Sequence, residues 1–511
     1  MQEIAPPKSG SIYPKILGGT ACLGVGGLVS FLQDFNTGIL AFLWCSFTIF
    51  SYCFPRGGLW LLFIYMPLSG TIIYSDLGQG HPWYHLVTDT LYLPAAIALT
   101  RKPGLLRHFL QEIKPLLPIL GILLLLCFAT LIFVNGTQSD PKENSLLVGL
   151  LGLKILVGHI PLLFCGYCLM VTEKDLLTFN RLQVLIVVLC CTLLLIQYRL
   201  LVTGICPGSL GLDSYALDKA TLEARCLVGG SLLYNPEWGL IRLPGTFVSP
   251  WQWGWFLISG AFFTYACYVG DTTHRWRFGS AIAMGYVAIA TLVSGQRIAV
   301  ALVPTVFLIL LILTDRRRRW IPVKLGIISF LALSLASRFI NLQAPIESFI
   351  NRWQASPPYR FIIEQFHWIA SQKEGWLGNG LGHGTNAARI LGNTTLIETY
   401  YAKLLYEIGL FGMLTFLLLV SMLTWLTWKA YRSLQQPHLK RLGICFWVFV
   451  LLMSYNTFYY PLDVDPVAVY YWFLAGVLLK LPQLDHKIPL PDDLFSSTSV
   501  KKRRFRWQNP Q

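Results

Sequence analysis

Charged residues are scarce in this chain of 511 residues. Asp, Glu, Lys and Arg make up only 13% of it, against 54% for hydrophobic residues, and the mean hydropathy is +0.55. Soluble domains carry roughly 25% charged residues, so the composition excludes a soluble globular protein. Apolar runs of about 17–25 residues, the length that crosses a bilayer core, recur along the whole sequence. We therefore expect a chain that crosses a membrane many times.

Several features of other protein classes are also missing. The start, MQEIAPPKSG, lacks the charged region and apolar stretch of a cleaved signal peptide. No pair of CxxC motifs has zinc-site spacing, and no Asp-rich motif lies in the predicted outer loops, so we expect no metal and no other cofactor. The net charge of +15 comes from short loops between apolar runs. It indicates membrane topology and contact with membrane lipids rather than nucleic-acid binding.

The apolar runs predict an all-α polytopic membrane protein with about 12–14 transmembrane helices, because helices pair their own backbone groups in lipid. The fourteen segments are 15–33, 36–54, 58–75, 83–100, 115–134, 147–171, 181–203, 251–270, 278–294, 296–314, 321–340, 399–428, 441–460 and 467–482. With this count the basic loops, from 101–114 to 501–506, all lie on one side. Positive loops stay cytoplasmic, so both termini are predicted to be cytoplasmic.

Two long segments, 204–250 and 341–398, are predicted on the outer side, where we expect them to cap one cavity. Loops of this length are usually functional or disordered. Apolar residues recur at helical spacing in 359–374, which predicts an amphipathic helix along the membrane surface or a helical cap on the bundle. Residues 1–482 are predicted to form one transmembrane domain, and 483–511 a basic cytoplasmic tail.

Two arginines stand at the outer ends of predicted spans. Arg297 begins a span after Ser-Gly-Gln, and Arg242 lies just before another span on the same side. An arginine inside a span costs roughly 2.5–3.5 kcal/mol, so it usually has a partner or a ligand, unless it snorkels to the lipid headgroups. Position alone leaves both interpretations open. A pair of arginines on one face favours an anionic ligand, since the guanidinium fork matches phosphate oxygens.

Other polar features fall on the same predicted face. GWLGNGLGHGTN (375–386) is glycine-rich, and glycines such as Gly380 and Gly382 let backbone N–H groups approach an anion. His383 lies in this loop, and Glu398 begins the twelfth predicted span. The remaining candidates for substrate binding are Arg360, Arg389 and Tyr401, with Arg352 in reserve.

These motifs, in this order, resemble the O-antigen ligase and O-antigen polymerase family of bacterial membrane glycan transferases. The matching pieces are RLPGTFVSPW, SGQR, the Arg360 helix leading into GWLGNGLGHG, and YEIGLFG after a polar residue. The resemblance covers roughly residues 235–416. It implies a GT-C-like helical bundle in the bacterial inner (plasma) membrane, with a catalytic site on the outer face.

The family's chemistry is a metal-independent, inverting transfer of a glycan from polyprenyl diphosphate to a glycan, lipid or protein acceptor. The resemblance implies that Arg242 and Arg297 hold the diphosphate. The family places a histidine, acting as general base, nine residues before the glutamate of its E-x-G motif. That glutamate is Glu407 here, and the position nine residues earlier is Glu398. Glu398 could replace the histidine as base or simply favour a helix N-terminus, and His383 is a rival base.

The sequence leaves two functional questions open. The main alternative function is a lipid-linked glycan or polysaccharide transporter or flippase, although we find no internal repeat of the kind that transporters tend to carry. Ligase and polymerase differ only in the acceptor and cannot be separated here.

One pair of cysteines is a candidate disulfide. Cys206 and Cys226 share the first outer segment, where an oxidising compartment would allow a disulfide worth about 2–4 kcal/mol. Two unpaired thiols near the membrane are the alternative.

Overall fold

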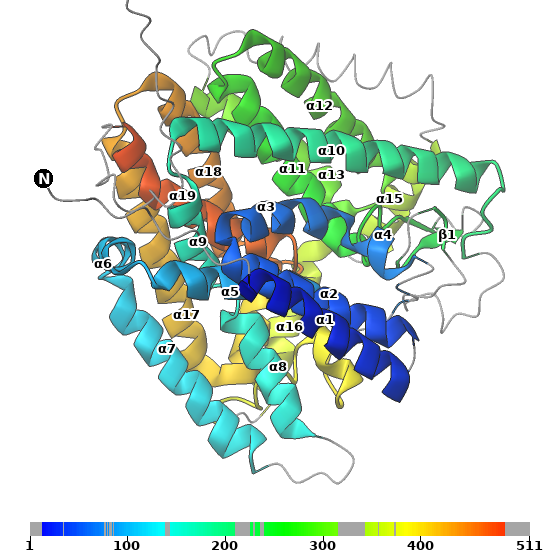
Figure 1. Ribbon diagram of the computed structural model, residues 1–511. Helices are drawn as coiled ribbons and strands as arrows, with labels where there is room; N and C mark the ends of the chain where they lie inside the picture. The colour runs from blue at the N-terminus through cyan, green and yellow to red at the C-terminus, as the bar shows by residue number, and fades with distance from the viewer. Residues whose placement is uncertain are drawn as a thin grey trace, which may run out of the picture.

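The computed structural model describes residues 13–33, 35–75, 86–137, 144–209, 225–227, 230–235, 240–314, 343–355, 357–372 and 375–485, together with residues 78, 80 and 84. In this part the regular elements are helices apart from one short hairpin, in which β1 pairs with β2 in antiparallel register (Figure 1). The predicted all-α fold is confirmed. The hairpin lies within the first predicted outer segment.

The elements follow one another in chain order. In the first half they are α1 (Tyr13–Leu32), α2 (Phe35–Cys53), α3 (Pro55–Tyr65), η1 (Met66–Leu68), α4 (Ser69–Ile73), α5 (Val87–Thr100), α6 (Pro103–Glu112), α7 (Leu116–Thr130), η3 (Leu131–Asn135), α8 (Ser145–Val157), α9 (Pro161–Leu169) and α10 (Glu173–Val202). In the second half they are β1 (Leu233–Asn235), β2 (Leu240–Arg242), α11 (Pro250–Gly270), α12 (His274–Val293), α13 (Arg297–Thr314), α15 (Gln343–Ala355), α16 (Pro358–Ser371), η6 (Asn386–Ile390), α17 (Tyr400–Ser433), α18 (Pro437–Tyr455), η7 (Pro461–Asp463) and α19 (Val467–Asp485).

Ten helices or joined helices of the described part are long and apolar enough to cross a membrane. The protein is thus a multi-pass helical membrane protein. Every predicted span overlaps one to three helical elements, except 321–340, which lies outside the described residues. The basic segments 315–319 and 486–511 lie outside them too. Residues 483–485, predicted to begin the tail, continue α19.

Two of the spans are broken. The predicted span 147–171 is divided at residues 158–160 into α8 and α9, where Pro161 begins the second half and lacks a backbone donor. In α17 the break is at Gly409, whose φ of 68° and ψ of −177° are not helical. Figure 1 shows the first turns of α17 bent away from the rest of this helix.

The two ends of the helical bundle carry different charged residues. One end carries ion pairs between helix termini, namely Arg56–Asp175, Arg181–Asp271 and His438–Glu173. Helix α12 begins three residues after Asp271 and leads to Arg297, so Arg297 lies at the other end. We call that end the arginine end. It also holds β1, α4 and α15, as Figure 1 shows.

Candidate functional site

A glycine turn brings the two predicted arginines together. Gly295, in the turn between α12 and α13, has a φ of +66°, and a Cβ atom on it would lie 1.8 Å from the carbonyl oxygen of Ile241 in β2. The Leu243 N–H donates to the Ser294 carbonyl at 3.0 Å. Only glycine allows this backbone approach without strain. The SGQR motif therefore sets β2, with Arg242, directly beside the start of α13, with Arg297.

Arg352 of α15 completes an arginine cluster that consists of Arg242, Arg297 and Arg352. Arg297 Nη1 donates to the Arg352 carbonyl at 2.7 Å, and Arg352 Nη1 donates to the Gly295 carbonyl at 2.8 Å. The predicted outer segments 204–250 and 341–398 thus meet at one end of the bundle. Helix α13 begins at Arg297, so the positive end of its dipole points to the same place.

The electrostatics of this cluster favour an anion. Burial, followed by the like charges of Arg242 and Arg297, lowers the pKa of Arg352 to about 10. The Nε atom of Arg242 is buried and has no hydrogen-bond partner among the described residues. Keeping like charges together in a partly buried site costs free energy. A doubly or triply charged anion such as a diphosphate would relieve this cost and accept the remaining donors.

The segment 456–466, between α18 and α19, joins the arginine cluster to Glu398. Arg297 Nη2 donates to the Tyr459 hydroxyl at 3.4 Å, and the Tyr459 carbonyl accepts from Trp255 Nε1 at 3.2 Å. Tyr460 is buried, and its hydroxyl hydrogen-bonds to the Asn386 side chain. Burial, with the charge of Glu398 as the next cause, raises the pKa of this hydroxyl, which stays protonated.

The two tyrosines also have unusual backbone conformations. Tyr459 and Tyr460 have φ values of 55° and 32°, in the left-handed region that costs about 1–3 kcal/mol for such residues and often marks a functional site. Their Cα atoms are about 3.8 Å apart, as for any neighbours. One tyrosine contacts the arginine cluster and the other lies near Glu398. Sequence analysis missed both, because they were included in the predicted span 441–460, whereas α18 ends at Tyr455.

Glu398 is held at the entrance of α17 by its neighbours. The Thr399 N–H donates to the Gln365 side chain of α16 at 2.9 Å, and Thr399 forms a β-bridge with Phe458. The Tyr400 N–H donates to the Thr457 carbonyl. Glu398 itself is half-buried. Its backbone is therefore fixed on both sides, beside the segment that carries Tyr459.

The glycine loop packs tightly against helices. A Cβ atom on Gly382, whose φ is +83°, would lie 2.1 Å from the Val148 carbonyl of α8. A Cβ atom on Gly380 would crowd His383 and Asn135. The Asn135 side chain also receives the Leu381 N–H at 2.9 Å. His383 Nε2 lies 3.2 Å from the Ser145 hydroxyl. Glycine is needed at 380 and 382 because the loop packs closely on η3 and α8. The His383 side chain faces Ser145 at the start of α8.

A buried ion cluster ties this loop to α17. Lys403 forms ion pairs with Asp463 and, at 3.7 Å, with Glu407. Glu407 Oε1 accepts hydrogen bonds from the Gly384 N–H at 2.9 Å and the Thr385 hydroxyl at 2.8 Å. Lys403 and Glu407 are only 2% and 1% exposed, so the carboxylate of the E-x-G motif holds the loop in place. Lys403 and Asp463 were not among the predicted residues.

The other predicted residues belong to α16, η6 and α17. Arg360 and Arg389 are exposed, on α16 and η6. The Tyr401 hydroxyl donates to the Ser454 carbonyl and faces α18. Within the described residues, no group of three or more His, Cys, Asp or Glu side chains could hold a metal ion. The structure therefore gathers Arg242, Arg297 and Arg352. Glu398 is connected to them only through Tyr460, which lies near Glu398, and its neighbour Tyr459, which contacts Arg297. Arg360 and Arg389 are on the surface, and Tyr401 faces α18.

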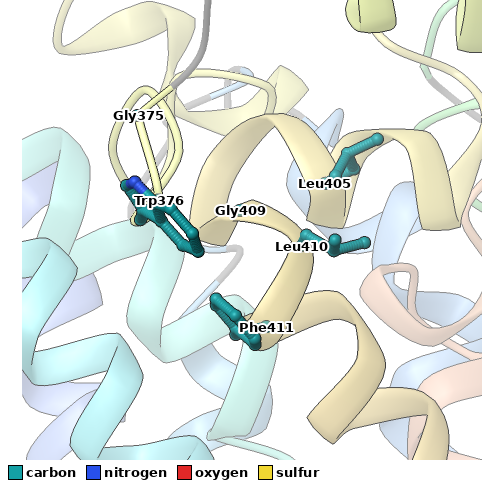
Figure 2. Close-up of a pocket in the computed structure, with 6 residues that line it drawn as sticks. All are labelled: Gly375, Trp376, Leu405, Gly409, Leu410 and Phe411. Carbon is teal, nitrogen blue, oxygen red and sulfur yellow. The ribbon is translucent and has the colours of Figure 1, made fainter.

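A small apolar cavity of about 220 Å³ lies at the break of α17 (Figure 2). Its lining residues are Gly375, Trp376, Leu405, Gly409, Leu410 and Phe411. The rings of Trp376 and Phe411 stack with centroids 5.6 Å apart. This lining offers no charged group for a phosphate, so the cavity is separate from the chemistry of the arginine cluster.

Comparison with known proteins assigns no family. No protein-family model matches the chain, and no curated protein matches its sequence.

Proposed function

We propose that the protein transfers or polymerises a glycan carried on polyprenyl diphosphate, without a metal ion and with inversion at the anomeric carbon. The observation that carries this proposal is the arginine cluster. Three guanidinium groups share one partly buried site at a helix end of a membrane bundle. Such a site suits a diphosphate whose lipid tail stays in the bilayer. The motif order that resembles the O-antigen ligase and polymerase family supports the same chemistry.

The proposed reaction uses the cluster and Glu398 in different roles. The acceptor hydroxyl attacks the anomeric carbon and loses its proton to the Glu398 carboxylate. The bond between that carbon and the diphosphate oxygen breaks on the opposite side. The electron pair leaves with the diphosphate, whose growing charge Arg242, Arg297 and Arg352 stabilise. Tyr459 lies beside Arg297 and offers a further donor to the same phosphates.

The proposed location is the outer face of a bacterial inner membrane. Cys206 and Cys226 form a disulfide with a Cα–Cα distance of 5.6 Å at the arginine end, and disulfides persist in oxidising compartments. The opposite end carries Arg56, Arg181 and the basic segments 101–114, 273–277 and 429–432, as expected for a cytoplasmic face. Both facts favour an arginine end that faces outward, with both termini in the cytoplasm.

A second candidate function, a transporter or flippase for lipid-linked glycans, is favoured by another observation. Lys154 and Asp89 form an ion pair at 2.8 Å, and buried His159 contacts Asp465 at 3.1 Å, where α8 breaks into α9. Ionisable residues at a broken transmembrane helix are typical of transport pathways. This cluster does not explain why three arginines gather at the helix ends, so we rank transfer first.

One reconstitution experiment separates the two functions. Purified protein in liposomes receives a labelled glycan on polyprenyl diphosphate, with a second lipid-linked glycan as acceptor. Transfer releases free polyprenyl diphosphate and lengthens the glycan, and the product length distinguishes a polymerase from a ligase. A transporter would move the intact labelled lipid to the other leaflet without release. Translocation without any release would refute the proposal.

A further inference from the structure

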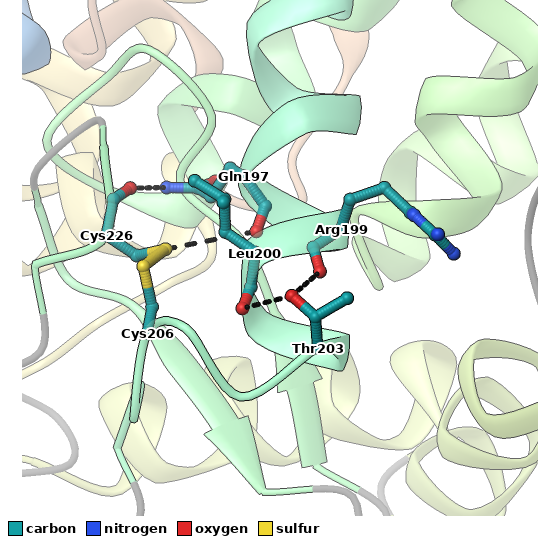
Figure 3. The surroundings of a disulfide bond; sticks show 6 residues. All are labelled: Gln197, Arg199, Leu200, Thr203, Cys206 and Cys226. Atoms are coloured by element: carbon teal, nitrogen blue, oxygen red, sulfur yellow. Dashed lines mark hydrogen bonds between the residues drawn. A yellow bond between two sulfur atoms is a disulfide. The ribbon is translucent and has the colours of Figure 1, made fainter.

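The disulfide between Cys206 and Cys226 lies next to the strand pair that carries Arg242. Cys206 follows α10, and its N–H donates to the Leu200 carbonyl at 3.2 Å. Cys226 is buried, and its carbonyl accepts from Gln197 Nε2 of α10 at 3.2 Å. Figure 3 shows both cysteines against the end of α10, with the strands beside them. The disulfide therefore fixes the chain after α10 to the segment that leads into β1.

Ser209 transmits this attachment to the hairpin. It lies three residues after Cys206 and is 2% exposed. Its hydroxyl donates to the Tyr234 carbonyl at 3.0 Å and accepts from the Tyr234 N–H at 2.8 Å. The Ser209 side chain thus hydrogen-bonds both the N–H and the carbonyl of Tyr234, on the edge of β1 that faces away from β2. In place of a third strand, the cysteine-bound segment holds this edge.

The hairpin register carries the attachment to Arg242. Tyr234 is paired with Ile241, and Leu233 with Arg242. Arg242 is the last residue of β2, and the chain continues to Leu243, which bonds to Ser294. A strand pair of three residues is marginal by itself. Besides the packing of buried Ile241 and the hydrogen bond from the Ser231 N–H to the Val248 carbonyl, two attachments hold its edges, the Gly295 turn on one and Ser209 on the other.

We propose that the Cys206–Cys226 disulfide and Ser209 are positioning elements for Arg242, so that the anion affinity of the arginine cluster depends on the disulfide. This inference rests on the proposed function, because it takes the ligand of the cluster to be a diphosphate. A disulfide that only closed its loop would stabilise the fold without a specific effect on Arg242. The two roles make different predictions in combination with an Arg242 variant.

The test measures binding of polyprenyl diphosphate without a glycan to the full chain. The double variant Cys206→Ser/Cys226→Ser should bind at least about fivefold more weakly than wild type, since an arginine–phosphate contact is worth roughly tenfold or more. In an Arg242→Ala background the same cysteine changes should weaken binding by less than about twofold, because the contact is already gone. Ser209→Ala keeps the disulfide but should weaken binding as much as the double cysteine variant does. Cys53→Ser, which replaces an exposed free cysteine, is the control and should bind like wild type.

Equal losses in the wild-type and Arg242→Ala backgrounds, or no loss in either, would overturn the inference. Hydrogen exchange of the amides of 233–235 and 240–243 gives a readout that does not need a ligand. It should accelerate in the double cysteine variant and stay unchanged in Cys53→Ser, and unchanged exchange in both variants would also overturn the inference. If wild type binds no diphosphate while exchange accelerates as expected, the proposed function fails and the positioning role stands.

Discussion

Arg297 and Arg352 are joined by two hydrogen bonds to main-chain carbonyls. Arg297 donates to the Arg352 carbonyl, and Arg352 donates to the Gly295 carbonyl two residues before Arg297. The reciprocal contact fixes two guanidinium groups of like charge side by side. Under the proposed function, this arrangement is a preformed site for an anion.

Arg352→Met should therefore stabilise the protein without ligand and weaken its binding to diphosphate. The lowered pKa of Arg352, about 10 against an ordinary 12.5, means that the charged form is disfavoured by folding. The penalty is complete below pH 10 and disappears as the pH rises from about 10 to 12.5, because over this window the unfolded chain binds more protons. At neutral pH, Arg352→Met removes this penalty and should raise the unfolding temperature of the protein in detergent. An unfolding temperature below that of wild type would contradict this explanation.

The same shift predicts how binding depends on pH. Wild-type affinity for polyprenyl diphosphate should fall as the pH rises through about 10, because Arg352 loses its proton there in the protein without ligand. Arg352→Met should lack this alkaline decrease and bind more weakly at neutral pH. Identical pH profiles for the two proteins between pH 8 and 11 would show that Arg352 does not face the anion.

Gly295→Ala should disturb the arginine cluster, whereas a glycine substitution within α12 should not. The new Cβ atom would collide with the Ile241 carbonyl, and the φ of +66° is unfavourable for alanine. We expect a loss of stability above about 1 kcal/mol and diphosphate affinity reduced at least about tenfold. Gly285→Ala on α12 is the matched control, since nothing lies within 4 Å of its added Cβ. Similar behaviour of the two variants in unfolding and binding assays would refute the role of the turn.

The sequence predicted the spans and the identity of the paired arginines because both depend on local signals. Apolar length and loop charge mark the spans, and an arginine at a span end is unusual in itself. The role of Gly295 could not be predicted, since it depends on the approach of Ile241 from a distant segment. Tyr459 and Tyr460 continued an apolar run, so only Asn456 and Pro461 hinted that α18 ends early. The glycine loop suggested an anion site by composition, whereas its glycines are explained by contacts with α8.

Glu398→Gln should keep donor binding and slow transfer by at least about a hundredfold, because a positioned general base contributes typically 10²–10⁴-fold. The change keeps the shape of the side chain and its place near Tyr460. His383→Ala is the comparison, and it should slow transfer less, since His383 contacts Ser145 on α8. Transfer is measured as release of polyprenyl diphosphate at saturating donor. Normal transfer by Glu398→Gln together with loss in His383→Ala would assign the base to His383.

Lys403→Met should destabilise the protein strongly. It would leave Asp463 and Glu407 buried without their cation, and breaking such a cluster costs roughly 3–5 kcal/mol. The glycine loop, held by Glu407, should become more accessible to protease as well. Lys429→Met, on an exposed position of the same helix, should change the unfolding temperature little. Equal unfolding temperatures for the two variants would show that the buried cluster contributes nothing to stability.

The central claim, that the arginine cluster binds a diphosphate, is tested most directly by the affinity of Arg297→Lys for polyprenyl diphosphate. Lysine keeps the charge but loses the two-pronged contact, so affinity should fall roughly tenfold or more. Arg199→Lys, which changes an exposed arginine in the last turn of α10, should bind like wild type. Wild-type affinity in Arg297→Lys, or no measurable binding by wild type itself, would contradict the account.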